Sequence, residues 1–263
     1  MLHFTTYKKS ASAPWVTFIH GAGGSSSIWF KQLRSFKNEF NVLLVDLRGH
    51  GKSKSPISEK IKSYSFDVIS DEVIEVLDYL KIKSSHFVGI SLGTIIIREI
   101  AERYPEKMES MIMGGAVMKL NLRGQVLMRL AAMLKSIIPY IVLYKFFALI
   151  LMPKKAHKES RNLFIKEAKK VYEKEFKRWF TLLAEVNPLL YLFRIKDSGI
   201  KTLYIMGQED HMFLPSIKNL VKDHLSSTLI VIPNCGHVVN VDQPSIFNTK
   251  VIHFIKQNHT YIQ

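Results

Sequence analysis

Cysteine is nearly absent from this sequence, which contains a single one, Cys235, among its 263 residues. One cysteine excludes an internal disulfide and is consistent with a reducing compartment. The opening residues, 1–9, lack the basic and then apolar layout of a secretory signal. These two features predict a cytoplasmic protein.

The sequence also lacks an apolar run long enough to cross a bilayer. The strongly apolar stretch 137–152 has only 16 residues and includes Pro139 and Lys145, whereas a spanning helix needs roughly 20 apolar residues. We therefore expect no transmembrane span. Burial among other helices, or a place at an interface, explains this stretch better.

Acidic residues are scarce relative to basic ones: 22 Asp and Glu stand against 37 Lys and Arg, for a formal net charge of +15. Residues 119–200 hold 17 basic and 6 acidic side chains, a balance of +11. Such a surface is either a solvated charged face or one that attracts an anionic amphiphile or an acyl-carrier protein. Nucleic acid is not expected, because no recognition motif and no aromatic and basic platform is present.

Strand-like and helix-like segments alternate through residue 118, and the alternation resumes at residue 201. Between them, residues 119–200 show only helical periodicity. The length and the 47% apolar content suit a folded α/β protein. We predict an α/β core of residues 1–118 and 201–263, with a helical lid of residues 119–200. Within the lid, residues 158–180 predict one amphipathic helix whose apolar face holds Phe164, Ala168, Val171, Tyr172, Phe176, Trp179 and Phe180.

Ser91 lies in a G-x-S-x-G pentapeptide between two contrasting segments. Residues 85–90 predict a short buried strand, and residues 94–104 predict a helix. A serine on a sharp turn from strand to helix has a strained backbone and projects its hydroxyl above the sheet. The same turn aims the amide of Leu92 and the positive end of the helix dipole at the reacting oxygen. Ser91 is therefore the candidate nucleophile.

Asp210 and His237 are the candidate acid and base that a weakly nucleophilic serine needs. Each follows the C-terminal end of a predicted strand, residues 201–206 for Asp210 and residues 227–232 for His237. Sites of open α/β sheets gather at that edge. Glu209 competes with Asp210 as the acid, and the G-x-x-D spacing favours Asp210.

A glycine-rich turn follows the predicted strand 14–19. Such a turn frees backbone N–H groups to point at a developing negative charge. We assign the N–H of Ala22 as the second oxyanion donor, beside the N–H of Leu92. His20 and Gly21, in the same turn, are assigned to substrate binding.

These motifs together resemble the lid-bearing branch of the α/β-hydrolase superfamily, and the chain order Ser91, Asp210, His237 is the one expected there. The similarity spans essentially the whole chain, although residues 119–200 match only in position and helical character. Thr94 is bulkier than the small residue that many relatives have there, and the stretch before the first motif is short, so a reduced opening hairpin is expected. The matching motifs are H-G-x-G at 20–23, D-x-x-G-x-G-x-S at 46–53, G-x-S-x-G at 89–93, G-x-x-D at 207–210 and G-H at 236–237.

The resemblance implies a mostly parallel sheet flanked by helices, with the lid inserted between strands 6 and 7 of the family layout. It also implies a serine hydrolase without metal or organic cofactor, in which Ser91, Asp210, His237, Ala22 and Leu92 have the roles given above. The expected substrate is a small-molecule ester or thioester of lipid-like or anionic character, cleaved through an acyl-enzyme.

A serine at position 91 argues against dehalogenase and epoxide hydrolase relatives, which need a carboxylate there. Carboxylesterase, monoacylglycerol-type lipase, thioesterase, lactonase and carbon–carbon hydrolase activities stay open. A lyase-type relative and a non-catalytic ligand receptor on the same fold also stay open, because fold alone does not fix function. The sequence does not determine the oligomeric state.

Overall fold

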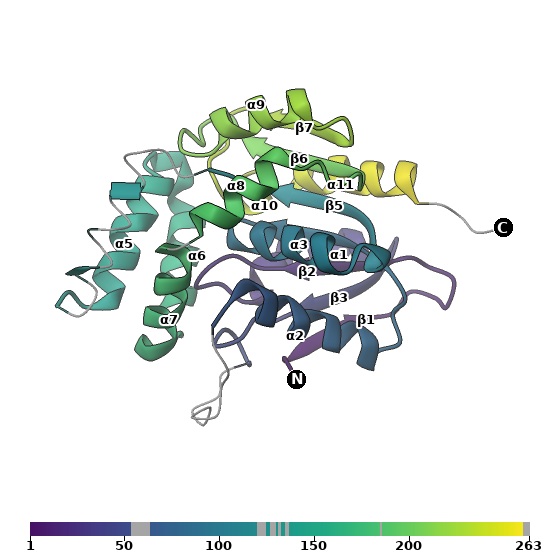
Figure 1. Ribbon diagram of the computed structural model, residues 1–263, viewed down its shortest axis with the longest axis horizontal. Helices are drawn as coiled ribbons and strands as arrows, with labels where there is room; N and C mark the ends of the chain where they lie inside the picture. The colour runs from purple at the N-terminus through teal and green to yellow at the C-terminus, as the bar shows by residue number, and fades with distance from the viewer. Residues whose placement is uncertain are drawn as a thin grey trace.

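A seven-stranded sheet forms the centre of the fold (Figure 1). The structure is a computed structural model that describes residues 1–53, 64–119, 125–126, 130, 133–134, 137–184 and 186–259. The strand order is β1-β3-β2-β4-β5-β6-β7; β1 runs antiparallel to β3, and the other neighbouring pairs are parallel. The strands are β1 (Phe4–Tyr7), β2 (Trp15–Ile19), β3 (Asn41–Val45), β4 (Ser85–Ile90), β5 (Met108–Gly114), β6 (Thr202–Gly207) and β7 (Ser227–Ile232).

Helices cover both faces of this sheet. The face with α1 and α11 has one apolar core, and the face with α2, α3 and α9 has another. These helices are α1 (Phe30–Lys37), α2 (Phe66–Tyr79), α3 (Leu92–Arg103), α9 (Leu214–Asp223) and α11 (Pro244–Asn258), with the short α10 (Val239–Asp242) before α11. The 3-10 turns are η1 (Ser26–Trp29), η2 (Pro105–Lys107) and η3 (Lys155–His157).

The strands have continuous apolar runs because helices cover the sheet on both of its faces. In β3, Val42 and Leu44 pack in the core beneath α1 and α11, whereas Leu43 and Val45 pack in the core beneath α2 and α3. Because successive side chains point to opposite faces, a strand buried on both faces is mostly apolar along its whole length. The predicted α/β-hydrolase architecture is confirmed, and β1 is the reduced opening element.

Helices α5, α6, α7 and α8 stand between β5 and β6, in the range expected for the lid (Figure 1). Three of them, α5, α6 and α7, lie together beyond one end of the sheet. The range 119–200 has no strand among its described residues. The insertion lies between β5 and β6 of the observed strands. Its place between strands 6 and 7 of the family layout stays a prediction. The inserted helices are α5 (Tyr140–Leu151), α6 (Lys158–Ala168), α7 (Glu173–Ala184) and α8 (Asn187–Ile195).

The prediction of one helix over residues 158–180 is wrong, because the chain turns between α6 and α7. Helix α6 ends in two backbone hydrogen bonds that each span only three residues. Lys170 N–H donates to Glu167 C=O, and Val171 N–H donates to Ala168 C=O. The turn buries Val171 and leaves Tyr172 half exposed. The apolar pattern is helical on both sides of the turn, so periodicity alone could not reveal the break.

Helix α5 accounts for most of the apolar stretch 137–152. Its 12 residues bury Leu143, Tyr144 and Ala148. Across the described part of the chain, no helix has both the length and the apolar character needed to cross a bilayer.

The core beneath α1 gives a matched test of packing. Phe18 is 1% exposed, and the centroid of its ring lies 4.9 Å from that of Trp29 and 5.0 Å from that of Phe36. Phe30, by contrast, is 55% exposed. We expect Phe18→Ala to lower the free energy of unfolding by about 3–5 kcal/mol through the cavity it leaves. Phe30→Ala should change it by less than about 0.5 kcal/mol. Urea unfolding followed by circular dichroism measures both, and equal losses would contradict the core assignment.

Candidate active site

Ser91 occupies the turn between β4 and α3 with φ +53° and ψ −119°. A non-glycine residue in this region costs about 1–3 kcal/mol and persists only where its surroundings hold it. Here the Ser91 N–H donates to Gly114 C=O at 3.0 Å, and the Thr94 N–H donates to Ser91 C=O at 2.9 Å. The strained turn projects the hydroxyl beyond the end of the sheet, as the pentapeptide predicts.

The two glycines of the pentapeptide are required by close packing. A side chain on Gly93 would overlap the backbone carbonyl of Ile19 at the end of β2, and one on Gly89 would lie 2.9 Å from the Gly93 backbone. Without side chains at these positions, the start of α3 lies directly against the central strands. The N-terminal end of α3, with its partial positive charge, is thereby fixed beside Ser91.

The structure brings the three predicted side chains into one chain of hydrogen bonds. His237 Nε2 lies 2.9 Å from Ser91 Oγ, and His237 Nδ1 lies 2.7 Å from Asp210 Oδ2. A carboxylate only accepts, so Nδ1 carries the proton and Nε2 is left to accept from the serine hydroxyl. Asp210 and His237 are each 2% exposed. This geometry can remove the Ser91 proton as its oxygen attacks an electrophile.

Asp210, and not Glu209, orients the imidazole. The second Asp210 oxygen accepts from the Phe213 N–H at 3.1 Å, which fixes the carboxylate. Glu209 instead binds two residues of the insertion, Lys154 at 2.7 Å and His157 at 2.8 Å. The hydrogen bond from Lys154 lowers the pKa of Glu209. The two neighbouring carboxylates therefore make different contacts. Asp210 accepts a hydrogen bond from His237, and Glu209 joins the insertion to the core.

Ala22 and Leu92 border the same space as Ser91. The backbone N–H of neither residue donates to another described residue, so both are available to a developing oxyanion. Gly21 lies against the serine, since a Cβ built on it would be 3.2 Å from Ser91 Cβ. These positions agree with the predicted oxyanion donors, whose role stays a prediction.

His20 has a different place from the substrate-binding position assigned to it. The ring is fully buried and borders neither cavity beside Ser91. Its Nδ1–H donates to Gly21 C=O at 2.8 Å, and its Nε2 accepts from the Leu47 N–H at 3.0 Å. Burial lowers the pKa of His20, which keeps the ring neutral. His20 therefore holds the turn that carries Gly21 and Ala22.

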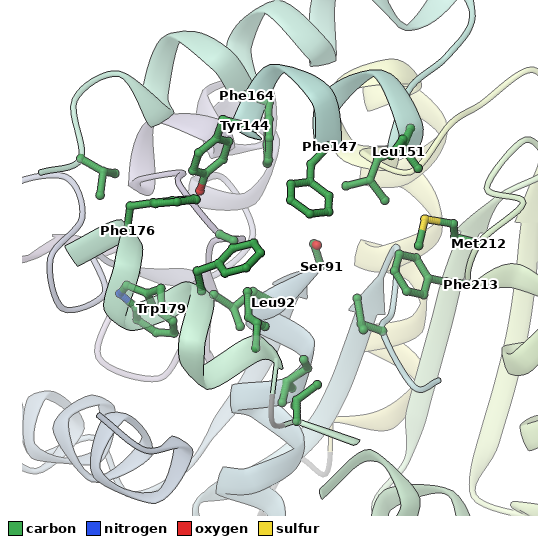
Figure 2. Close-up of a pocket in the computed structure, with 18 of the residues that line it drawn as sticks. Ser91, Leu92, Tyr144, Phe147, Leu151, Phe164, Phe176, Trp179, Met212 and Phe213 are labelled. Carbon is green, nitrogen blue, oxygen red and sulfur yellow. The ribbon is translucent and has the colours of Figure 1, made fainter. Parts of the chain in front are cut away.

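A cavity of about 140 Å³ opens in front of Ser91 (Figure 2). Aromatic and aliphatic side chains surround it, and none of its lining residues is charged. Figure 2 shows Tyr144, Phe147 and Phe164 of the insertion entering from the top of the view, with Met212 and Phe213 of the core on the right. The residues that line it are Ala22, His50, Ser91, Leu92, Ile95, Val117, Tyr144, Phe147, Ile150, Leu151, Phe164, Val171, Phe176, Trp179, Phe180, Leu183, Val186, Met212 and Phe213.

A second, smaller cavity of about 20 Å³ also borders Ser91. His237 lines this cavity and does not line the larger one. Its wall includes the carboxylate of Glu167, which is 5% exposed and accepts from the Ser25 hydroxyl at 2.8 Å. Ser91 thus stands between a large apolar cavity and a smaller one, also mostly apolar, whose lining includes Glu167 and His237.

Comparison with known proteins agrees with this geometry. A family model described as the alpha/beta hydrolase fold matches residues 14–244. The chain belongs to the α/β-hydrolase family.

Curated relatives of this α/β-hydrolase include two enzymes that act on esters or lactones, by their names. 3-Oxoadipate enol-lactonase 2 of Acinetobacter baylyi is 25% identical over 95% of this chain and 91% of that protein. Pimeloyl-[acyl-carrier protein] methyl ester esterase of Wigglesworthia glossinidia brevipalpis is 28% identical over 92% and 93%. The crystal structure of a hydrolase from Oleispira antarctica superposes with a TM-score of 0.85 at 17% identity, over 98% of this chain and 95% of that one. The chain is accordingly assigned to the hydrolases.

Three further residues lie beside the candidate site of this α/β-hydrolase, and no motif in the sequence assigns a role to them. Thr94, noted from the sequence only as a bulky departure, donates its hydroxyl to Ser91 C=O at 2.6 Å and accepts from the Val117 N–H at 3.3 Å. Tyr144 places its hydroxyl against the turn at Gly23, and burial raises the pKa of Tyr144, so that the hydroxyl can donate. Glu167 lines the small cavity. No local motif marks Tyr144 or Glu167, because folding of the insertion brings them to the site.

Groups that could bind a metal lie elsewhere. His86, Glu109 and His259 place ligand atoms within 4.8 Å of one another, near the N-terminal ends of β4 and β5 and so away from Ser91. Cys235 is buried, and burial raises the pKa of its thiol, which keeps it unreactive. The absence of a metal or cofactor from the reaction stays a prediction.

The two neighbouring carboxylates allow a matched test of the site. We expect Asp210→Asn to slow labelling by a fluorophosphonate probe by about 10³–10⁴-fold, because an amide at this position favours the wrong imidazole tautomer. Glu209→Gln removes a carboxylate one residue away and should leave the labelling rate within a few-fold. Ser91→Ala should not label. Equal losses in the Asp210 and Glu209 variants, with circular dichroism spectra unchanged, would contradict the assigned acid.

Proposed function

We propose that this α/β-hydrolase is a serine esterase that cleaves carboxylic esters through an acyl-enzyme. The observation that carries the proposal is the hydrogen-bonded series Asp210, His237, Ser91 at the mouth of an apolar cavity. A base aligned on a serine hydroxyl by a buried carboxylate is the arrangement that activates serine toward carbonyl carbon.

In the first step, Ser91 Oγ bonds to the ester carbonyl carbon while its proton passes to His237 Nε2. The carbonyl oxygen becomes an anion that the Ala22 and Leu92 N–H groups bind, and Asp210 stabilises the imidazolium. The bond from carbon to the alcohol oxygen then breaks, and that oxygen takes the proton from His237. A water molecule repeats the sequence on the acyl-enzyme and releases the acid, which restores the Ser91 hydroxyl.

The larger cavity suits the acyl part of the substrate. Its lining lacks charged side chains, so an apolar chain buried there loses contact with water without displacing a solvated ion. Besides Ser91, the residues with polar groups that line this cavity include Tyr144 and His50. An unbranched or lightly branched apolar acyl group meets these requirements.

The smaller cavity suits the alcohol part. The leaving oxygen must lie within reach of His237 Nε2 to take its proton, and His237 borders the smaller cavity and not the larger one. About 20 Å³ holds one or two groups the size of water. We infer that the preferred substrates are esters of small alcohols, such as methyl or ethyl esters.

The named activities of the relatives support this choice. One relative is named a methyl ester esterase acting on a pimeloyl group carried by acyl-carrier protein, and another an enol-lactonase. A small-molecule substrate is therefore proposed for this chain too. An acyl-carrier protein as the bearer of the acyl group, attracted by the basic insertion, stays a prediction, as does the cytoplasmic location.

A panel of esters tests the acyl preference. Among methyl esters of linear acids, kcat/KM should rise by up to about fourfold per added methylene while the chain still fits the large cavity, and then level off. Ser91→Ala should abolish turnover. Best activity on acetate, with none beyond butyrate, would count against an apolar acyl site, and absence of both turnover and probe labelling would favour a receptor.

Two leucines test the division between the cavities. Leu163 lines only the smaller cavity and Leu183 only the larger. Leu163→Ala should raise the activity on butyl octanoate relative to methyl octanoate by about tenfold, since the removed methyl groups make room for the alcohol. Leu183→Ala should instead move the optimum toward longer acids and leave the alcohol preference unchanged. The same shift in both variants would contradict separate acyl and alcohol sites.

A further inference from the structure

The outer side of α5 is apolar and uncovered. Val142, Phe146 and Leu149 follow one another at the spacing of one helix face and are 49%, 47% and 53% exposed. The opposite side of the helix lines the large cavity with Tyr144, Phe147, Ile150 and Leu151. Apart from Lys145, α5 has apolar or aromatic residues on all sides, and such a helix is normally buried. Figure 1 instead shows α5 at the edge of the molecule, away from the sheet.

The apolar surface continues along the chain before α5. Ile137 is 78% exposed and Met133 is 76% exposed. Of the 17 large apolar side chains that are exposed among the described residues, 12 lie between residues 119 and 200, so the exposure is a property of the insertion and not of the whole surface. Concentrated exposure of this kind marks an interaction surface.

Exposed lysines occur in the same part of the insertion, from α5 to the start of α7. Six of these exposed lysines have no ion pair with another described residue. They add to the balance of +11 that the sequence gives for residues 119–200. Cationic side chains beside an apolar helix face are attracted to anionic lipid headgroups. The six are Lys145, Lys155, Lys158, Lys166, Lys169 and Lys174.

We propose that the insertion docks onto an anionic lipid bilayer, with the outer face of α5 in the boundary between headgroups and acyl chains. The 12 residues of α5 extend about 18 Å, well short of the ~30 Å hydrocarbon core, so the helix lies along the surface. Docking would place α5, which forms one wall of the large cavity, at the membrane surface, where apolar esters concentrate. The docking itself does not depend on the proposed esterase activity.

Other occupants fit the surface less well. A second copy of this chain would bring two insertions of charge +11 together, and like charges across an interface oppose association. An acidic protein would neutralise the lysines but leave Val142, Phe146 and Leu149 against a polar surface. Only an anionic bilayer offers both an apolar layer and negative charge.

Sedimentation of the full chain with vesicles tests the proposal. Binding should be at least about tenfold stronger to phosphatidylcholine vesicles that contain about 30 mol % phosphatidylglycerol than to phosphatidylcholine alone. It should weaken between about 0.05 M and about 0.5 M salt, because screening reduces the attraction of exposed charges.

Two triple substitutions separate the contributions of the apolar face and of the lysines to vesicle binding. The triple change Val142→Ser, Phe146→Ser and Leu149→Ser should lower binding at least about tenfold, and Lys166→Glu, Lys169→Glu and Lys174→Glu should lower it similarly. The matched controls are Leu225→Ser and Lys250→Glu, at exposed positions outside the insertion, which should bind like the wild type. None of the substituted residues lines a cavity, so hydrolysis of a soluble methyl ester or probe labelling confirms an intact site.

The proposal is overturned if the wild type does not bind anionic vesicles, or if the serine variant binds them as well as the wild type. It is also overturned if light scattering shows a dimer that the serine variant loses while vesicles stay unbound. An inactive but vesicle-binding protein would contradict the proposed function and leave the docking intact.

Discussion

The strained backbone at Ser91 is the constraint on which the rest of the site depends. Its positive φ directs the hydroxyl away from the sheet and toward His237, at a cost of about 1–3 kcal/mol. Hydrogen bonds to Gly114 and from Thr94 hold the turn, and the missing side chain at Gly93 lets α3 approach β2. The same contacts fix the Leu92 amide. A relaxed turn would therefore displace both the candidate nucleophile and one of the two predicted oxyanion donors.

The reactive groups and the shape of the substrate space come from different parts of the chain. The strand ends of the core carry Ser91, Asp210 and His237, whose positions follow from the sheet. The inserted helices supply most of the large cavity and the Glu167 wall of the small one. Helix α5 has an apolar face on the cavity and a second one on the solvent. Substrate choice and surface attachment can thus change through the insertion without moving the reactive groups.

Local sequence patterns were sufficient to predict most strands of the core, but they were insufficient to predict the helices of the insertion. The predicted strands at 85–90 and 227–232 have the bounds observed for β4 and β7, because continuous apolar runs between turns admit few alternatives. The reduced opening element was expected, but the bounds of β1 were not, since its four half-buried residues form an edge with a weak pattern. The turn at 169–172 escaped notice because both flanking helices are amphipathic. His20 matched a motif, yet its ring is enclosed within the turn.

The sequence by itself determined the α/β-hydrolase fold and which serine and histidine meet, because strand ends in a parallel sheet converge on one edge. The G-x-x-D spacing favoured Asp210 over Glu209, but only the tertiary structure showed that Asp210 contacts the imidazole, because spacing does not fix the direction in which a side chain points. The tertiary structure alone decided the two cavities and the place of Tyr144 and Glu167. These depend on how distant helices pack over the sheet, and packing between segments leaves no periodic signal in the chain.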